Sequence, residues 1–177
     1  MEDGIGDAQH LFPVRAALPW VPANNSKAQT KNCLPRVSGS RVIPIHEYFT
    51  GFRKTALLAD ELITSVRLPT DWRTAWYKIG KRGSINISLV CCAIGLSPRG
   101  EVRIAFGCVA PTVMRAKLAE AIIQRDGLTD TTIEAAAQSA MKEVSPIDDH
   151  RSSASYRRAM CGVLTRRLLR QLRGEQS

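Results

Sequence analysis

The amino-acid sequence predicts an α+β domain in which an antiparallel meander sheet of three to five strands packs with a C-terminal three-helix bundle. Two observations lead to this fold class. Apolar residues alternate with polar ones before residue 111, as in strands, and recur every three or four residues after it, as in helices. Strand patterns first and helix patterns last are typical of an α+β architecture. A chain of 177 residues with 44% apolar content is long enough to bury one core.

The N-terminal segment 1–38 shows no helical or strand period. It contains the polar run "NNSKAQTKN" and four prolines, Pro13, Pro19, Pro22 and Pro35. We therefore expect residues 1–38 to be poorly ordered or unassigned and residues 39–174 to form the organised domain. At the start of that domain, "RVIPI" is typical of an edge strand, where proline is tolerated, and "HEYF" of a single helical turn.

Four further strands are predicted. "LITSVRLP" alternates apolar Leu62, Val66 and Leu68 with polar residues, as a half-buried strand does, and "WRTAWYKIG" has a similar pattern. The apolar runs 86–97 and 101–110 flank "SPRG", whose proline and glycine favour a tight turn. These two runs therefore predict an antiparallel hairpin.

Three helices are predicted, over 112–124, 130–144 and 153–172. Asp130 or Thr131 would be the N-cap of the second helix, and the third would begin after Ser152 or Ser153. The apolar positions expected to face the core are, helix by helix, Met114, Leu118 and Ala121/Ile122; Ile133, Ala136, Ala140 and Val144; and Tyr156, Met160, Leu164 and Leu168.

A formal net charge of +9 would suit an anionic partner or an acidic neighbouring subunit. Only 6% of the residues are aromatic, however, and they do not alternate with cations as in a base-stacking surface, so nucleic-acid binding is the weaker alternative. Arg166, Arg170 and Arg173 are spaced to share one face of the last helix, away from its leucines. We expect that face to be either solvated or a docking surface for another subunit.

The five cysteines include no C-x-x-C pair, so an iron–sulfur or zinc site within the chain is not expected. Cys91 and Cys92 are adjacent and would point to opposite faces of a strand. Free, buried thiols are the prediction, which agrees with a reducing cytoplasm. The sequence has no run of eighteen apolar residues, so we expect no membrane span.

Short catalytic motifs are missing from the sequence, including G-x-G-x-x-G, the P-loop, H-E-x-x-H and G-x-S-x-G. The loop "GKRGS" at 80–84 could hold a phosphate through its amides, or be a basic loop without a ligand. Asp148, Asp149 and Arg151 precede the last helix, where a carboxylate can cap the amides, and Asp149 could pair with Arg151 or Arg157.

Four ordered blocks carry a resemblance to a known family. They are "IPIHEYFTGFRKTALLADELITSVRLP", "YKIGKRGSINISLV", "EVRIAFGCVAPTVMRAKLAEAII" and "PIDDHRSSASYRRAMCGVLTRRLL". In order and spacing they resemble the C-terminal domain of the FAD-binding (medium) subunit of molybdenum hydroxylases, the family of carbon monoxide dehydrogenase flavoproteins and the FAD portion of xanthine dehydrogenases. The resemblance covers about 43–170.

The resemblance implies an electron-transfer role in an FAD-dependent oxidoreductase complex. In this family, FAD receives electrons from an iron–sulfur subunit, which draws them from a molybdopterin-binding subunit. Glycine-rich A-G-G-T and G-G-N loops of an N-terminal domain hold most of the flavin, and this sequence contains neither loop. The chain would then be a fragment or a split-gene product, inactive alone.

By motif position, the resemblance places Ile63 where an apolar residue touches the flavin and Lys78 where a lysine approaches it. A cation there would stabilise the anionic reduced flavin; the alternative for Lys78 is an ordinary strand-edge lysine. Ser84, Ile85 and Asn86 stand where many members carry an acidic or alanine-aspartate pair. The alternative function is a non-catalytic assembly or interaction module that kept the fold and lost the flavin.

Overall fold

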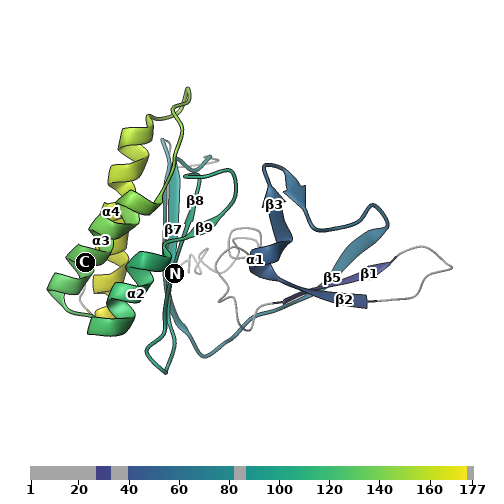
Figure 1. Ribbon diagram of the computed structural model, residues 1–177, viewed down its shortest axis with the longest axis horizontal. Coiled ribbons are helices and arrows are strands. Elements are labelled where there is room, and N and C mark those ends of the chain that lie inside the picture. The colour runs from purple at the N-terminus through teal and green to yellow at the C-terminus, as the bar shows by residue number, and fades with distance from the viewer. Residues whose placement is uncertain (1–26, 33–39, 82–86, 175–177) are drawn as a thin grey trace, which may run out of the picture.

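The computed structural model describes residues 27–32, 40–81 and 87–174, which form three antiparallel sheets and four helices. Figure 1 shows the three long helices on one side of the largest sheet and the strands of the two smaller sheets on its other side. The three-stranded sheet has the order β2-β1-β5, with β1 Lys27–Asn32, β2 Ser40–Pro44 and β5 Glu61–Arg67. The short helix α1 Ile45–Tyr48 follows β2, and β3 Phe49–Gly51 pairs with β4 Lys54–Thr55.

The four-stranded sheet is a simple meander in the order β6-β7-β8-β9. Its strands are β6 Arg73–Ile79, β7 Val90–Leu96, β8 Val102–Gly107 and β9 Met114–Arg115. Every pair is antiparallel, so each strand needs only a short connection to the next.

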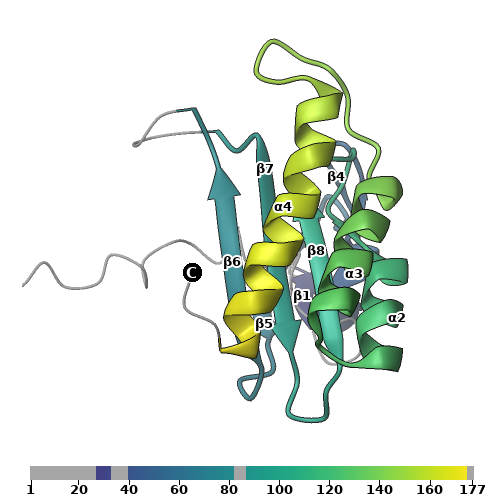
Figure 2. The same ribbon diagram turned by 90° about the vertical axis from the view of Figure 1, so that its left-hand side faces the viewer.

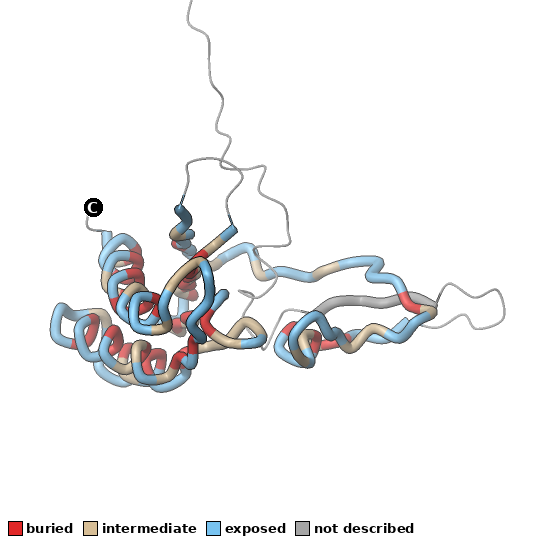
Figure 3. Tube along the Cα trace, turned by 90° about the horizontal axis from the view of Figure 1, so that it is seen from above, coloured by how far each residue is buried: buried red, intermediate tan, exposed pale blue. Residues whose placement is uncertain are grey.

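Helices α2 Lys117–Asp126, α3 Asp130–Glu143 and α4 Ala154–Arg173 form a layer on one face of this sheet. Helix α4 runs across β6 and β7, α2 lies over β8, and α3 packs against both helices (Figure 2). Buried residues follow the sides of the helices that face the sheet (Figure 3). The largest fully buried side chains of this core include Ile94, Ile104, Phe106, Ile133, Leu164, Leu168 and Leu169.

A second, smaller apolar cluster stabilises the three-stranded sheet and α1. It contains Ile43, Ile45 and Tyr48 and is separate from the main core. The buried Glu61 at the start of β5 accepts two hydrogen bonds from Arg41 of β2, both 2.7 Å long. This charged pair connects the two outer strands across β1, so the outer strands are held together at one end of the sheet.

The predicted fold class and the hairpin are confirmed, since β7 and β8 pair as expected on either side of the turn. The N-terminal segment, by contrast, contributes the strand β1, and the rest of 1–38 lies outside the described residues. The predicted strand "LITSVRLP" is present as β5, but it is mostly exposed, with Leu62 60% exposed. It is exposed because β5 is an edge strand beside a small core, and within residues 27–32, 40–81 and 87–174 no layer covers its apolar side chains.

Helix α2 begins at Lys117 instead of 112, because Met114–Arg115 continue the sheet as β9. Its buried positions are Ala119, Glu120 and Ile123, so the prediction that Leu118 faces the core is wrong.

The other two helices lie close to their predicted bounds. In α3 the predicted core positions are buried, but the N-cap is Thr129, whose hydroxyl accepts a hydrogen bond from the Thr132 amide. In α4, Leu164 and Leu168 are buried as predicted, whereas Tyr156 is exposed and the neighbouring Arg157 is buried in its place. The apolar face of α4 is therefore rotated from the predicted one at its first turn.

We predict that Leu164→Ala lowers the free energy of unfolding by roughly 2–5 kcal/mol, because the side chain is almost fully buried and its removal leaves a cavity. Leu118→Ala is the matched control, since Leu118 is 65% exposed, and it should change stability by about 0.5 kcal/mol or less. Denaturant midpoints of the two variants provide the comparison. Equal losses would contradict the orientation of the helix layer.

Candidate functional site

The four-stranded sheet has one face that the helices cover and one that they leave uncovered. Ile94 and Ile104 stand opposite each other in register and belong to the core beneath the helices. Because side chains alternate along a strand, the neighbouring row Trp76, Ala93 and Ala105 points to the other face. We call this other side the helix-free face. Small side chains lie at its centre, and the half-exposed indole of Trp76 lies on its edge strand β6.

Lys78 lies on the helix-free face. Its backbone partner on β7 is Cys91, which in turn pairs with Gly107 on β8. The preceding residue, Tyr77, points toward α4, where the Arg167 guanidinium lies 4.7 Å from the centre of its ring. The sheet alternation thus separates the exposed Lys78 from the helix layer and directs it to the open side.

Ile63 lies on β5, with its side chain partly exposed at 39%, and so belongs to a different sheet from Lys78. The helix-free face looks toward the side of the molecule where β1, β2 and β5 lie (Figures 1 and 3). The structure therefore places both residues on the side away from the helices without joining them into one site. Their contact with a flavin stays a prediction.

The predicted phosphate loop falls largely outside the described residues. Of "GKRGS", Gly80 and Lys81 are described, and they follow directly after β6. Ser84, Ile85 and Asn86 also lie outside the described residues.

The loop before α4 has the capping role predicted for its aspartates. Asp148 accepts a 2.7 Å hydrogen bond from the Ala154 amide at the start of the helix. Asp149 accepts hydrogen bonds from the amides of Arg151 and Ser152, and its other oxygen accepts one from the Arg157 guanidinium at 2.8 Å. These donors hold the pKa of Asp149 down at about 2, the two backbone amides first and then the arginine.

Arg157 is a buried cation that joins the helix layer to the sheet. Its Nη1 donates to the carbonyl oxygens of Leu89 and Cys108, at 2.6 and 2.9 Å, and its Nη2 donates to Asp149. The two carbonyls lie at the start of β7 and just after the end of β8. Arg157 therefore fixes the corner of the sheet to the first turn of α4. Sequence reasoning named it only as a possible partner of Asp149 and did not predict its burial.

Cys91 and Cys108 lie at this same corner. The prediction that all the thiols are buried is wrong for these two. Cys108 is exposed and Cys91 is partly buried, whereas Cys92 and Cys161 are buried as predicted. The Cys91 sulfur lies over Gly107, the residue before Cys108, and the two thiols are close enough for each to shift the pKa of the other. The hairpin register was the available signal, because a residue paired with Gly107 also neighbours position 108.

The sequence analysis also did not predict a buried carboxylate in α2. Glu120 is only 3% exposed, accepts a 2.8 Å hydrogen bond from the Ile104 amide of β8 and forms a two-point ion pair with Arg115 of β9. Strand β9 pairs only with Ala105 and Phe106 of β8, so the Ile104 amide has no partner on β9. Glu120 accepts its hydrogen bond instead and therefore has a structural role.

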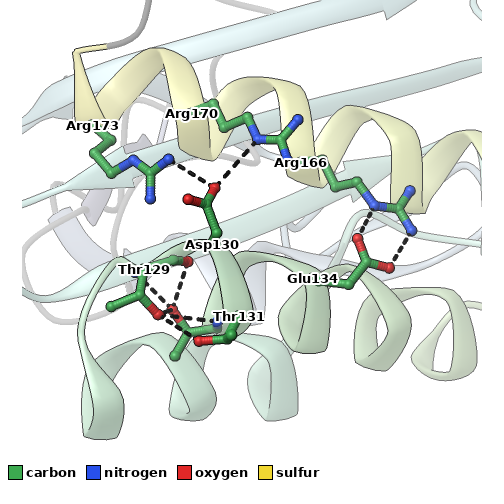
Figure 4. Close-up of polar contacts among 8 residues, drawn as sticks. Thr129, Asp130, Thr131, Glu134, Arg166, Arg170 and Arg173 are labelled. Carbon is green, nitrogen blue, oxygen red and sulfur yellow. Dashed lines mark hydrogen bonds and ion pairs between the residues drawn. The ribbon is translucent and has the colours of Figure 1, made fainter.

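The arginine stripe of α4 lies at the surface, as predicted, but its side chains pair with acidic residues of α3. Arg166 forms a two-point pair with Glu134, at 2.5 and 2.7 Å, and lowers the pKa of that carboxyl to about 2 (Figure 4). Arg173 donates to Asp130 at 2.9 Å, with Arg170 at 3.9 Å from the same carboxylate. The three arginines therefore link two helices of the same chain, which weakens the case for a nucleic-acid surface there.

None of the helices in the described part of the chain combines the length and apolar character needed to cross a membrane.

The chain matches a described protein family over residues 75–172, the CO dehydrogenase flavoprotein C-terminal domain. This match covers the whole four-stranded sheet except its first two residues, and the helix layer except its last residue.

Similar proteins bear the names of flavin-binding or medium subunits. The chain is 30% identical over 139 residues to the xanthine dehydrogenase FAD-binding subunit of Escherichia coli, with 74% of this chain and 48% of that one covered. It is 33% identical over 137 residues to the nicotine 6-hydroxylase medium subunit of Paenarthrobacter nicotinovorans, with 75% and 48% covered. It therefore spans about half the length of these relatives.

Among solved structures, the chain is similar to carbon monoxide dehydrogenase from Hydrogenophaga pseudoflava, in a form described as lacking the Mo-pyranopterin moiety of the molybdenum cofactor. The TM-score is 0.72 at 30% sequence identity, with 83% of this chain and 52% of that chain covered.

We predict that Arg157→Ala lowers the free energy of unfolding by about 3 kcal/mol, because two carbonyls and a carboxylate lose their shared donor. Arg157→Lys should recover only part of this loss, since one ammonium cannot reproduce the geometry of the guanidinium. The neighbouring Arg158→Ala, an exposed position, is the control and should be close to wild type. Equal denaturant midpoints for the two alanine variants would refute the role assigned to Arg157.

We also predict a specific acid dependence for Asp149. Its pKa in the folded chain, about 2, lies below the ordinary value of about 3.9 for an unfolded aspartate. Its ionised form therefore stabilises the fold above about pH 4, and this contribution is lost as the pH falls toward 2. The stability difference between wild type and Asp149→Asn should shrink over that range in urea titrations. A constant difference would count against the hydrogen-bonding role of the carboxylate.

Proposed function

Because the chain belongs to the family of the CO dehydrogenase flavoprotein C-terminal domain, we propose that it forms one wall of the flavin site in an FAD-containing electron-transfer subunit. The complex would be a cytoplasmic molybdenum hydroxylase-type oxidoreductase. The observation that carries the proposal is the helix-free face, which the three long helices leave uncovered and which has small central side chains, with Ala105 buried among its neighbours, and the exposed Lys78 on its edge strand.

The chemistry of this face fits the ring system of a flavin. A planar ring can lie close to a sheet where the side chains are small, as Ala93 and Ala105 are. FAD, when bound, supplies an acceptor of electrons whose reduced form can be an anion. The ammonium group of Lys78 would favour that anion electrostatically, and Ile63 would supply an apolar contact.

Exposed apolar residues in the three-stranded sheet and directly after its strand β5 support a neighbouring segment that covers this side. Val42, Leu62 and Leu68 are each at least 45% exposed, although β-strands commonly bury such residues. We propose that another part of the flavoprotein subunit covers them, in agreement with a chain that spans about half the length of its relatives.

The pyrophosphate of FAD needs backbone amides of a glycine-rich turn or a helix N-terminus. The sequence contains neither an A-G-G-T nor a G-G-N run. We therefore propose that a separate polypeptide segment binds the phosphates and that this chain is inactive alone. By extension from the relatives that are named as medium subunits, the partners would be an iron–sulfur subunit and a molybdopterin-binding subunit.

The alternative is an assembly or interaction module that keeps the fold and binds no flavin. Flavin binding distinguishes the two, since only the first hypothesis requires the helix-free face to contact FAD.

We predict that the 177-residue chain alone binds FAD weakly, and that adding the N-terminal half of a related flavoprotein subunit yields a tight yellow complex. In that complex Lys78→Ala should lower the flavin reduction potential more than it weakens binding, because the cation favours the reduced anion. Lys142→Ala, on the solvent side of α3, is the matched control and should leave the potential unchanged.

Flavin absorbance, titration of bound FAD and spectroscopic redox titration provide these measurements. Failure of the complex to bind FAD would support the assembly module. A bound flavin whose potential is the same in both lysine variants would remove Lys78 from the site.

A further inference from the structure

The corner of the sheet beside Arg157 holds two thiols in an unusual arrangement. Cys91 stands opposite Gly107 in the β7/β8 register, and Cys108 is the next residue after that glycine. The sulfur of Cys91 lies directly over the glycine, because a β-carbon placed at 107 would be only 2.5 Å from it. The absence of a side chain at 107 therefore leaves room for the Cys91 sulfur beside Cys108.

Cys108 is in a strained and accessible position. Its φ of 66° lies in the left-handed region, which residues other than glycine rarely adopt. It is exposed, and the guanidinium of Arg157 donates to its carbonyl oxygen. The hydrogen bond from Cys91, together with the positive charges of Arg157 and Arg151, lowers the pKa of the Cys108 thiol to about 7.

The pKa of Cys91 is shifted in the opposite direction. Its hydrogen bond to Cys108 and its partial burial raise its pKa, so it keeps its proton while Cys108 carries the negative charge. One thiol is thus a nucleophile open to solvent, and the other is a protonated neighbour within reach of it. Cys92 and Cys161 differ from both, because they are buried in the main core.

We propose that Cys91 and Cys108 form a peroxide-reactive pair that closes reversibly to a disulfide. The Cys108 thiolate attacks one oxygen of a hydroperoxide, the O–O bond breaks, and Cys108 becomes a sulfenic acid as hydroxide or alkoxide leaves. The Cys91 thiol then attacks that sulfur, the S–O bond breaks, and the oxygen leaves as water with the Cys91 proton. Two thiols are oxidised by two electrons, and the peroxide is reduced to water, or to water and an alcohol.

Cys91 lies on the helix-free face, because it is the backbone partner of Lys78, and Cys108 lies at the adjoining corner just after the end of β8. Closing the disulfide changes the surface next to that lysine whether or not a flavin is bound. The proposal is therefore independent of the proposed function, and it can be tested on the chain without FAD.

The test uses the full chain in a Cys33→Ser background, since Cys33 lies outside the described residues. The protein is treated with hydrogen peroxide, unfolded, alkylated with N-ethylmaleimide and digested with trypsin. Cys91 lies in the fragment 83–99 and Cys108 in the fragment 104–115, so their disulfide links two separate peptides. We expect this linked species to accumulate, to disappear on treatment with dithiothreitol, and to leave Cys161 fully alkylated.

Two variants assign the link, because Cys92 shares a fragment with Cys91. Cys108→Ser should abolish the linked species. Cys91→Ser should also abolish it and leave Cys108 as a sulfenic acid that dimedone traps; Cys91→Ala replaces it if the serine variant does not fold. The rate of peroxide reaction should rise about fivefold from pH 6 to pH 7 and level off by pH 8, following ionisation of Cys108.

Three outcomes would overturn the proposal. The first is a linked species that persists in Cys91→Ser, which would place the bond on Cys92. The second is over-oxidation of Cys108 in the background protein while Cys91 remains alkylated. The third is equal reactivity of all four remaining cysteines, which would show that the corner gives no selectivity.

Discussion

The buried guanidinium of Arg157 is the interaction on which the arrangement of sheet and helices depends. An arginine remains charged in proteins, so burying it is costly unless acceptors surround it. Here the acceptors come from the residue before β7, the residue after β8 and the loop before α4. These three places are far apart in sequence and can supply their oxygens together only in the observed packing. The same charge also acts on Cys108, so one buried cation both stabilises the fold and adjusts the chemistry of a thiol.

The α+β class and the hairpin were predictable because they depend on local signals. The turn at Pro98 and Gly100 and the apolar runs on either side of it predict β7 and β8 without knowledge of the rest of the chain. Helix α3 was likewise predictable from the spacing of Ile133, Ala136 and Ala140, all of which are buried. In each case the spacing of apolar residues within the element itself is enough to identify it as a strand or a helix.

Other features depend on partners that are distant in sequence and were missed for that reason. Met114 and Arg115 have a helical spacing with the residues after them, yet they pair with β8 because an edge of the sheet is available there. In the sequence, nothing distinguishes Arg157 from an ordinary surface arginine, because its acceptors come from distant residues. The side chains of Leu62 and Ile63 are exposed because no described part of the chain covers them, which alternation alone cannot reveal. The flavin contacts assigned to Ile63 and Lys78 come from the resemblance alone and stay a prediction, since neither residue has a local signature of flavin contact.

The two apolar clusters have a consequence for the order of folding. In the four-stranded sheet every strand pairs with the next one along the chain, and the helices that cover it follow in sequence. Such short-range connectivity favours rapid, cooperative folding. The three-stranded sheet, by contrast, must close a long loop, because β5 pairs with β1 after the chain has formed β2, α1, β3 and β4. We therefore expect residues 73–173 to form their native contacts before the three-stranded sheet, whose pairing of β1 with β5 needs the longer loop closure.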